Sequence, residues 1–473
     1  MSEAKKILIG GEWRAGAESI RVASPWSGEV IAEVGSAGPD ELAAAVESAT
    51  EAAAEMKRLD RFRLAKGLRR MAEGIERRRE EFIESIVAEA GKPRRYARGE
   101  AERAIATFAW AAGEAERFTG EVVPVDTQPA GRGKMAYTLR IPRGVVFGIT
   151  PFNFPLNLVA HKVAPALASG NAVIIKPSDR TPLTSLLLGE VFGESGLPKS
   201  ALQVVPADVK HLDPIYTDGR IAMISFTGSD KVGWQIKQRA VKKFVTLELG
   251  GNAAVIVDET ADAEDTLRKN IVGAFAFSGQ VCISVQRIFV HESRFGAWID
   301  EFARRASLLK RGNPADEATE IGPMIDTASA ERAERWINEA LDGGAKLICG
   351  NRREGAMLEP TVLTASTPEM KVVSEEAFAP LAVVEPFARF EDAVELANHG
   401  RFGLQAGVFT RDLGRARLAA EQLEYGGVII NDVPTFRVDN MPYGGVKDSG
   451  FGREGLRYAM EEMTEPRLVV MSL

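Results

Sequence analysis

Between residues 145 and 342, short apolar segments with the length of strands alternate with longer segments of helical periodicity. The apolar segments are 145–150, 172–175, 202–205, 221–226, 245–249, 253–257 and 287–290. The helical segments are 156–167, 182–194, 229–240, 262–276, 293–309 and 328–342. This alternation is typical of βαβ units, in which parallel strands form a sheet with helices on both faces. Because ligands bind such sheets at the carboxyl ends of the strands, we expect the functional site there.

Helical periodicity also dominates the chain before this region. Residues 40–118 are rich in Ala, Glu and Arg, and apolar residues recur there at helical spacing. We expect two or three long amphipathic helices, and the charged run 77–81 fits a solvated helix face. In contrast, residues 119–141 and 466–470 have the composition of extended strands outside the sheet pattern. These two segments are candidates for contacts between subunits.

The charge balance and the scarcity of cysteine and histidine exclude several classes of protein. The 473 residues carry 59 Lys and Arg against 66 Asp and Glu, a net charge of −7, which argues against nucleic-acid binding. Cys282, Cys349 and four histidines form no spacing typical of a zinc site or a disulfide framework. No apolar run approaches the ~20 residues that span a bilayer, and residues 1–11 do not resemble a signal peptide. We expect a cytoplasmic protein with no metal and no membrane partner.

Two short motifs carry groups that suit covalent and acid–base chemistry. Cys282 follows Gly279 in an apolar segment, where a lone cysteine is either a buried hydrophobe or, near a helix N-terminus, a reactive thiol. Glu248 stands between two leucines and precedes a double glycine. Burial there would raise its pKa, as a general base requires, although the carboxylate would equally cap a neighbouring loop.

Two further motifs follow strands of the predicted sheet. Asn153 stands between Pro151 and Pro155 after the strand 145–150, a rigid position for a neutral donor to an oxyanion. Ser229 follows the strand 221–226 and opens a helix, whose free N–H groups suit an anion such as a phosphate. Ser229 is equally compatible with a simple N-cap.

Seven blocks in a fixed order resemble the aldehyde dehydrogenase superfamily over essentially the whole chain. They are Thr150–Pro155 (TPFNFP), Gly170–Asp179 (GNAVIIKPSD), Phe226–Ser229 (FTGS), Leu247–Gly251 (LELGG), Gly279–Cys282 (GQVC), Glu376–Pro380 (EAFAP) and Pro442–Glu454 (PYGGVKDSGFGRE). The resemblance implies an α/β fold with a Rossmann-like parallel-sheet cofactor domain, an α/β catalytic domain and a small β oligomerisation element. We expect residues 1–118 and 142–249 in the cofactor domain, 250–455 in the catalytic domain, and 119–141 and 456–473 in the oligomerisation element of a homodimer or homotetramer.

The resemblance assigns the chemistry to three residues. Cys282 is similar to the nucleophile that attacks the aldehyde carbon, and Asn153, with the backbone N–H of Cys282, would hold the oxyanion of the thiohemiacetal. Hydride transfer to the nicotinamide leaves a thioester, and Glu248 would activate the water that hydrolyses it to a carboxylic acid. One rival is transfer of the acyl group to CoA, in a branch that generally lacks this carboxylate. The other rival, a non-catalytic protein on the same scaffold, predicts a broken set of these three residues.

The resemblance also implies NAD as the cofactor, with NADP as the alternative. Lys176 resembles the lysine that binds the adenosine ribose, and Asp179 stands where NAD-preferring relatives usually have a longer glutamate, next to Arg180. The remaining positions are those at the pyrophosphate and around the nicotinamide ribose and ring: Gly228, Ser229, Phe152, Leu249, Glu376 and Phe378. The chain departs from its relatives at Pro206–Asp208, where many have glycines, and at Ala379, where glycine is usual.

For the substrate, residues 431–442 resemble the branch of lactaldehyde, phosphonoacetaldehyde and non-phosphorylating glyceraldehyde-3-phosphate dehydrogenases. The expected substrate-binding residues are Arg103, His161, Ile283 and Arg437, because guanidinium groups suit phosphate, phosphonate or carboxylate tails. Val281 argues the other way, since anion-binding relatives often have arginine immediately before the nucleophile, and both arginines would otherwise form structural ion pairs. We expect a small hydroxylated or anionic aldehyde.

Overall fold

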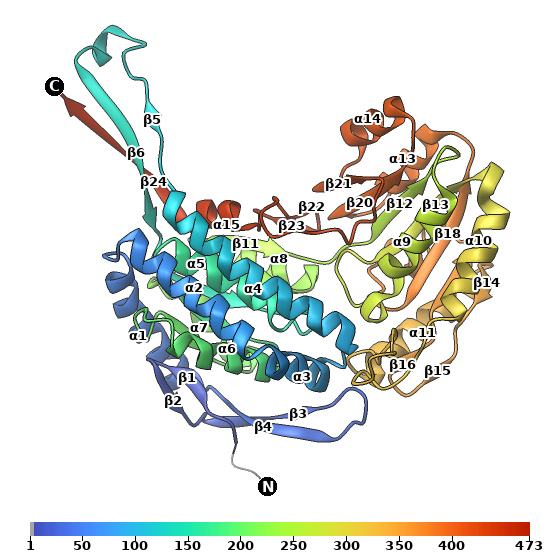
Figure 1. Ribbon diagram of the computed structural model, residues 1–473, viewed down its shortest axis with the longest axis horizontal. Helices are drawn as coiled ribbons and strands as arrows, with labels where there is room; N and C mark the ends of the chain where they lie inside the picture. The colour runs from blue at the N-terminus through green and yellow to red at the C-terminus, as the bar shows by residue number, and fades with distance from the viewer. Residues whose placement is uncertain (1–3) are drawn as a thin grey trace.

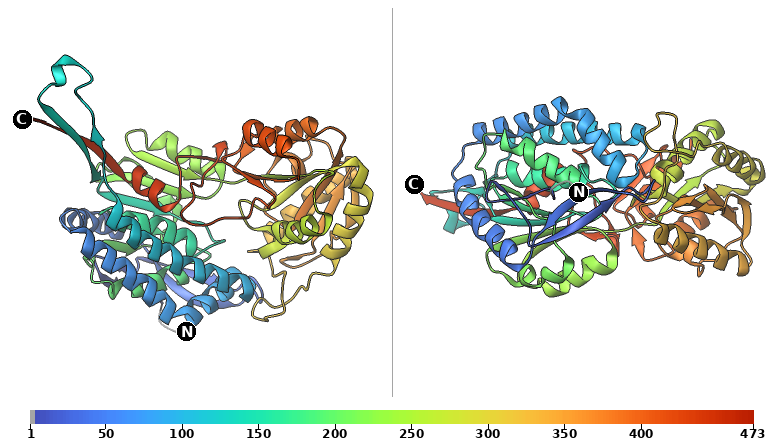
Figure 2. Two further views of the ribbon diagram at one scale, coloured as in Figure 1. Left: turned by 45° about the horizontal axis from the view of Figure 1, so that its top comes forward. Right: turned by 90° about the horizontal axis from the view of Figure 1, so that it is seen from below.

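The computed structural model describes residues 4–473, which form two lobes and a projecting arm (Figure 1). The first lobe surrounds an eight-stranded sheet and the second a seven-stranded sheet. The arm carries β5, β6 and β24, and it extends away from the first lobe in both further views (Figure 2). These parallel-sheet lobes, with their covering helices, confirm the expected α/β fold class.

The first sheet has the strand order β2-β1-β9-β8-β7-β10-β11-β23. Its five central strands are parallel: β7 (Val145–Ile149), β8 (Ala172–Lys176), β9 (Leu202–Val204), β10 (Ile221–Thr227) and β11 (Phe244–Glu248). The chain runs outward from β7 to β9 and then returns to place β10 on the other side of β7. Because the strand order reverses between β7 and β10, the loops that leave these two strands diverge and open a crevice. The edge strands β1 (Ile7–Ile9) and β2 (Glu12–Arg14) are antiparallel and were not expected.

Helices cover this sheet in two layers. Those in contact with the strands are α1 (Pro39–Met56), α5 (Asn157–Ala168), α6 (Leu183–Gly193) and α8 (Asp230–Arg239). An outer layer packs against α5 and α6 and contains α2 (Arg61–Arg77), α3 (Arg79–Ala90) and α4 (Arg94–Arg117). Two short elements, η2 (Val209–His211) and α7 (Asp213–Thr217), connect β9 to β10.

The N-terminal helical region therefore contains four helices, and the expectation of two or three was too low. The charged run 77–81 is largely exposed, as expected for a solvated helix face, but a junction at Arg78 divides it between α2 and α3. Arg78 leaves helical geometry there, with φ −106° and ψ 21°, and its guanidinium pairs with Glu81 and Glu190. Helical periodicity continues across this junction in the sequence because both helices bury the same kind of apolar face.

The second sheet has the order β14-β17-β18-β13-β12-β20-β21. Its parallel strands are β12 (Ala253–Val257), β13 (Val285–His291), β17 (Thr361–Thr364), β18 (Leu381–Phe387), β20 (Gln405–Phe409) and β21 (Gly427–Ile430), and β14 (Lys346–Cys349) is an antiparallel edge.

Alternate residues of β12 point to opposite faces of this sheet. Val255 and Val257 belong to a core cluster with α9 (Ala263–Phe275) and α10 (Glu292–Ser307). Ala254 and Ile256 belong to a second cluster that includes residues of α13 (Phe390–Asn398) and α14 (Leu413–Gln422). The sheet is therefore buried on both faces. Two more helices of this lobe, α11 (Thr327–Asp342) and α12 (Lys371–Ser374), pack against each other.

The chain crosses between the lobes more than once. Residues 249–252 lead directly from β11 to β12, and β23 (Gly450–Phe451) returns to pair antiparallel with β11. The following helix α15 (Leu456–Glu462) packs on α5. The loops between the lobes are therefore tied to both sheets.

The arm contains β5 (Val122–Val123), the turn η1 (Pro129–Gly131), β6 (Lys134–Pro142) and β24 (Thr464–Ser472). Strand β24 pairs with β6 along its whole length, so both extended segments expected from the sequence form one small sheet. Several apolar side chains of the arm are exposed: Val122, Met135, Leu139, Leu468 and Val470. The remaining strand pairs are β3 (Glu18–Ala23) with β4 (Val30–Ser36), β15 (Arg353–Glu354) with β16 (Met357–Leu358), and β19 (Phe402–Gly403) with β22 (Val446–Lys447).

Candidate active site

A cavity of about 440 Å³ lies at the crevice between β7 and β10. The first lobe contributes residues at the carboxyl ends of β7, β10 and β11, and the second lobe contributes residues that precede β13 and β18. Nine of the residues singled out in the sequence line it: Phe152, Asn153, Gly228, Ser229, Glu248, Leu249, Cys282, Glu376 and Phe378. The structure therefore brings together groups from five separate segments of the chain.

The loop that carries Cys282 has an unusual backbone conformation. It begins at η3 (Ala276–Gly279), where Phe277, Ser278 and Gly279 have consecutive positive φ angles of 50°, 54° and 68°. A Cβ on Gly279 would lie 2.0 Å from the carbonyl oxygen of Ala379, so only glycine fits. The Ser278 hydroxyl donates to the carbonyl oxygen of Gly322 at 2.7 Å and helps to hold this conformation. Each non-glycine residue in this region costs about 1–2 kcal/mol, which surrounding contacts must offset.

The thiol of Cys282 contacts the hydroxyl of Tyr443, with 3.0 Å between sulfur and oxygen. Burial raises the pKa of Cys282 to about 11, while the hydrogen bond with Tyr443 and the charge of Arg437 act in the opposite direction. Tyr443 is only 3% exposed, and burial raises its own pKa well above 10. Tyr443 therefore keeps its proton at neutral pH and is the donor whenever Cys282 is ionised.

Asn153 lies in the loop between β7 and α5. Its side-chain nitrogen Nδ2 donates to the carbonyl oxygen of Gln280 at 2.9 Å, which ties this loop to the loop that carries Cys282. An amide nitrogen has two hydrogens, so one remains for a further acceptor in the cavity. Glu100 accepts hydrogen bonds from the backbone N–H groups of Leu156 and Asn157, and it thereby fixes the start of α5 next to Asn153.

Glu248 is the last residue of β11 and is only 3% exposed. Neither of its carboxylate oxygens has a hydrogen-bond partner among residues 4–473. Burial raises the pKa of Glu248 well above its ordinary value, and repulsion by Glu454 adds to the rise. A carboxyl group of this kind, in the same cavity as Cys282, is suited to accept a proton from water.

The predicted cofactor residues fall into two groups. In the group predicted to surround the nicotinamide, Glu376 accepts from the backbone N–H of Gly251 at 3.0 Å, and burial raises the pKa of Glu376 to about 7. The rings of Phe152 and Phe378 meet edge to face at 5.9 Å between centroids. A Cβ on Gly250 would lie 2.3 Å from Oε2 of Glu376, so the double glycine makes room for this carboxylate.

The other group lies at the carboxyl ends of β8 and β10. Lys176 ends β8 and pairs with Asp179 at 2.7 Å, outside the cavity lining. Ser229 is the N-cap of α8 but makes no side-chain capping bond, so N–H groups of the first turn are left for another acceptor. Arg180 pairs with Asp326 of the second lobe at 2.9 Å, which links the two lobes at the cavity.

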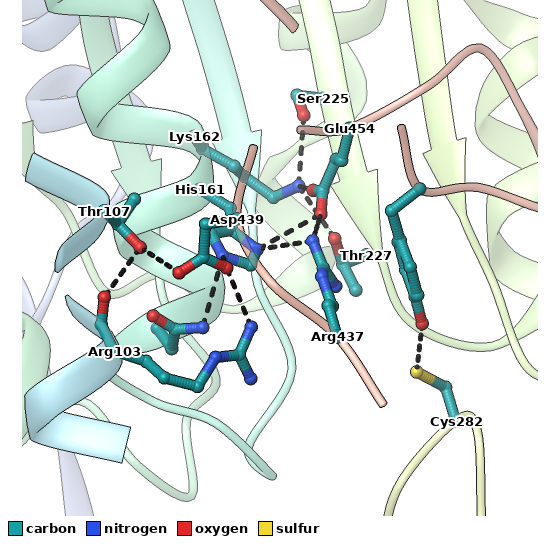
Figure 3. Close-up of polar contacts among 12 residues, drawn as sticks. Arg103, Thr107, His161, Lys162, Ser225, Thr227, Cys282, Arg437, Asp439 and Glu454 are labelled. Atoms are coloured by element: carbon teal, nitrogen blue, oxygen red, sulfur yellow. Dashed lines mark hydrogen bonds and ion pairs between the residues drawn. The ribbon is translucent and has the colours of Figure 1, made fainter. Parts of the chain in front are cut away.

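Three of the four predicted substrate residues, Arg103, His161 and Arg437, lie in a neighbouring ionic cluster (Figure 3), and none of the four lines this cavity. Asp439 accepts from Arg103 at 2.8 Å and pairs with His161 at 2.9 Å. Arg437 donates to Glu454 at 3.1 Å and contacts His161 at 2.9 Å. Ile283 belongs instead to a small apolar cluster with Leu404 and Tyr443.

A second cavity of about 520 Å³ adjoins the first through neighbouring residues. Arg103 lines it together with Arg95, Phe154 and Val281, and the last two are the chain neighbours of Asn153 and Cys282. The substrate-binding role of Arg103 and Arg437 stays a prediction, because the structure contains no substrate.

Sequence reasoning missed three groups near Cys282 and Glu248. Tyr443 was part of a recognised block, Pro442–Glu454, yet its hydroxyl was given no role. Lys162 is buried on α5 and pairs with Glu454 at 3.4 Å, near Glu248. Arg332 comes from α11, where nothing in the sequence distinguishes it from a surface arginine.

Among residues 4–473, no group of three or more His, Cys, Asp or Glu side chains is arranged to hold a metal ion. None of the helices in this part of the chain combines the length and apolar character needed to cross a membrane.

Comparison with known proteins gives matches along nearly the full chain. The sequence model described as "Aldehyde dehydrogenase family" matches residues 13–469. The 3-sulfolactaldehyde dehydrogenase of Priestia megaterium is 43% identical over 469 residues, which cover 99% of this chain and 98% of that protein. The lactaldehyde dehydrogenase of Methanocaldococcus jannaschii is 39% identical over 477 residues, covering 98% of this chain and 100% of that protein.

Solved structures agree closely with this fold. Aldehyde dehydrogenase 21 from Physcomitrella patens, in complex with the reaction product succinate, has a TM-score of 0.98 at 39% identity. The match covers 100% of this chain and 99% of that one. The glyceraldehyde-3-phosphate dehydrogenase GapN from Methanocaldococcus jannaschii, complexed with NADP, has a TM-score of 0.93 at 38% identity, covering 96% and 99% of the two chains.

Proposed function

Because the chain belongs to the aldehyde dehydrogenase family, it is an NAD(P)-dependent oxidoreductase of aldehydes, and we propose that it converts a small hydroxylated or anionic aldehyde to the carboxylic acid through a thioester on Cys282. The observation that carries this proposal is that Cys282, Asn153 and Glu248, from separate segments of the chain, line one cavity. The presence of all three residues in one cavity favours catalysis over a purely structural role.

The first half of the proposed reaction is addition to the aldehyde. The thiolate of Cys282 forms a bond to the aldehyde carbon, and the π electron pair of the carbonyl moves to its oxygen. The remaining N–H of Asn153 and the backbone N–H of Cys282 would hold this oxyanion, and each donor of this kind is worth roughly 3–4 kcal/mol. The hydrogen bond of Asn153 to Gln280 supports this role, because it fixes the amide relative to the nucleophile loop.

The second half is oxidation and hydrolysis. When bound, NAD(P)+ accepts a hydride from the substrate carbon, and Cys282 is left carrying a thioester. Glu248 would take a proton from a water molecule that attacks the thioester carbon, and the C–S bond then breaks to release the acid and the thiolate. The burial of Glu248 supports this role, since a raised pKa gives the carboxylate a useful affinity for the proton of water.

The residues around the cavity fit a dinucleotide. The uncapped first turn of α8 suits the pyrophosphate, and Glu376 has a second carboxylate oxygen for ribose hydroxyls. Lys176 and Asp179 lie at the carboxyl edge of the same sheet, where the adenosine ribose would bind. We propose NAD as the preferred cofactor, and rates with NAD and NADP at equal concentration measure the preference. We also propose that the first lobe is the cofactor domain and the second the catalytic domain.

The substrate class is supported by the second cavity and by the relatives. Arg103 lines this cavity next to Phe154 and Val281, and one of its side-chain nitrogens is buried without a partner. Arg103 pairs with Asp439 and Arg437 with Glu454, but of the two only Arg103 lines this cavity, so it is the better placed for an anionic tail. Relatives are named for 3-sulfolactaldehyde and lactaldehyde, which are small hydroxylated aldehydes.

A kinetic panel tests the substrate class. Lactaldehyde, glyceraldehyde, glyceraldehyde 3-phosphate, 3-sulfolactaldehyde and succinate semialdehyde are compared with propanal, hexanal and benzaldehyde, each with both cofactors. We expect the highest kcat/KM in the first group, and an Arg103→Gln variant should lose at least tenfold for the anionic members alone. Arg95→Gln is the matched control, because Arg95 lines the same cavity and pairs with Glu320. Equal kcat/KM across the panel would refute the substrate class.

Separate variants test the chemistry. Cys282→Ser should abolish NADH formation. Glu248→Gln should give a burst of NADH equal to the enzyme concentration and then slow turnover, because the thioester forms but is not hydrolysed. If added CoA accelerates the wild-type enzyme, the product is an acyl-CoA and the hydrolytic assignment is wrong.

The arm is proposed as the contact between subunits of a homodimer or homotetramer. Its exposed apolar residues, such as Val122 and Leu468, support this role because a projecting three-stranded sheet buries little of its own surface. Sedimentation of the chain and of a Leu468→Glu variant measures the oligomeric state. We also propose that the enzyme acts in the cytoplasm, which fractionation of the producing cells would test.

A further inference from the structure

We propose that Tyr443 is a further catalytic residue, which donates a hydrogen bond to the thiolate of Cys282 and thereby sets the reactivity of the nucleophile. The proposal rests on the assignment of Cys282 as the nucleophile. Tyr443 touches the reacting atom itself, with 3.0 Å between its hydroxyl oxygen and the sulfur. No other side chain among residues 4–473 forms a hydrogen bond with this sulfur.

The position of Tyr443 is fixed by its backbone and by its ring. Its N–H donates to the carbonyl oxygen of Glu454 at 2.9 Å, and the N–H of Glu454 donates back at 2.7 Å. The ring packs with Ile283 and Leu404, and Ile283 is the residue directly after the nucleophile. The hydroxyl therefore has little freedom to turn away, and the low conformational entropy of a locked ring favours a persistent bond.

Arg437 lies over the Tyr443 ring, with its guanidinium carbon 3.6 Å from the ring centroid. A cation over an aromatic face draws on the π electrons of the ring, and it makes the phenolic O–H a stronger donor. Figure 3 shows why Arg437 keeps this position, since Glu454 and His161 hold the guanidinium from the other side. The positive charge of Arg437 also favours the anionic form of Cys282. In this arrangement, Arg437 is a positioning residue that acts through Tyr443.

The hydrogen bond has a definite effect on thiol chemistry. Burial alone opposes ionisation of Cys282, and a charge-assisted bond from a retained O–H favours the thiolate. A thiolate of lower pKa is more abundant at neutral pH, but each thiolate is intrinsically less nucleophilic. The logarithm of its rate constant falls by about 0.4–0.5 for each unit by which its pKa falls. Loss of the bond must therefore slow the reaction at low pH and accelerate it at high pH.

The test is the pH dependence of Cys282 alkylation by iodoacetamide in the Tyr443→Phe variant, with no aldehyde or cofactor present. Mass spectrometry measures the rate at Cys282 and separately at Cys349, a thiol far along the chain that serves as an internal reference for exposure. Tyr458→Phe, on α15, is the matched control for loss of a phenolic hydroxyl. We expect the inflection for Cys282 to rise by about one to two pH units. Between about pH 6 and 9, below the wild-type inflection near pH 11, the rate at Cys282 should fall by roughly three- to tenfold.

The outcomes separate this proposal from its alternatives. A Cys282 rate that is lower than in the wild type between about pH 6 and 9, with the Cys349 profile unchanged, supports the proposal. Superimposable profiles would overturn it and leave Tyr443 as a packing residue. The proposal would also be overturned if Tyr443→Phe raised the KM for hydroxylated aldehydes alone and left alkylation unchanged, because Tyr443 would then bind substrate instead. The role of Tyr443 is tested by alkylation, which needs no turnover. The assignment of Cys282 as the nucleophile fails only if Cys282→Ser keeps its dehydrogenase activity. Failure of one assignment can therefore be distinguished from failure of the other.

Discussion

Replacement of Glu376 by glutamine should stabilise the fold while it weakens the cofactor site. Burial raises the pKa of this carboxyl group from 4.5 to about 7. Each pH unit corresponds to 1.36 kcal/mol, so above pH 7 the ionised carboxylate costs the folded chain roughly 3 kcal/mol. Glutamine has nearly the same shape, and its carbonyl oxygen can still accept from the N–H of Gly251. Glu376→Gln therefore removes the charge and keeps the local contact.

The sign of the effect depends on pH. A group whose pKa is raised by folding contributes stability that is fully present below the unfolded value, here 4.5, and is lost as pH rises through the folded value, about 7. The variant and the wild type should therefore be equally stable at pH 4. Their difference should grow between pH 4.5 and 7 and remain constant above pH 7. Glu248 also has a raised pKa, but it is present in both proteins and cancels in the comparison.

Calorimetry at a series of pH values measures this difference. For a chain of 473 residues that unfolds as one unit, roughly 3 kcal/mol corresponds to a rise in Tm of about 3 °C at pH 8. Glu395→Gln, on the exposed face of α13, is the control and should show no such trend. Fluorescence titration with NAD should give a Kd up to about tenfold higher for Glu376→Gln, since the charged acceptor is lost. A stability difference that does not vary between pH 4 and 8 would refute the reasoning.

Three further predictions follow from close contacts. Gly279→Ala places a Cβ 2.0 Å from a backbone oxygen at a residue with φ +68°, so kcat should fall by about 100-fold. The control is Gly296→Ala on α10, where a Cβ meets open space. This variant should keep full activity and gain up to about 1 kcal/mol in stability. Lys92→Met leaves the buried carboxylate of Glu100 without its positively charged partner. The free energy of unfolding, measured in urea, should fall by about 3–5 kcal/mol. The double variant with Glu100→Gln should recover most of that loss. Arg401 bridges Asp230 of the first lobe and Glu375 of the second, so Arg401→Gln should raise the KM for NAD, and an unchanged KM would show that this bridge does not support the cofactor site.

Most of the first sheet could be predicted from the sequence because its strands are buried on both faces. Segments such as 172–175 are uniformly apolar and are bounded by turn residues, so strand and helix are easily told apart. The strands β1 and β2 were missed because each has only three residues, and β2, at the edge of the sheet, is exposed throughout. The junction at Arg78 was missed because helical periodicity does not show where one helix ends and the next begins without glycine or proline.

The candidate site could be predicted as a set of residues but not as an arrangement. Parallel sheets led us to expect the site at the carboxyl ends of strands, which holds for Asn153 and Ser229 of the first lobe. Cys282 and Glu376 instead precede their strands, at the amino ends of the second sheet. The contact between Tyr443 and Cys282 joins residues 161 positions apart, and it forms only in the tertiary fold. No local pattern carries information of this kind.

The return of the chain to the first sheet has a consequence for biosynthesis. Strand β23 and helix α15 complete the first lobe, yet about 200 residues separate them from β11. During translation, the whole second lobe emerges from the ribosome before the first lobe can close, and β6 waits for β24 over more than 300 residues. An unpaired β6 is an exposed edge that can pair with other nascent chains. We therefore expect the nascent chain to need a holding chaperone after the rest of the first lobe has been made and before β23, α15 and β24 emerge.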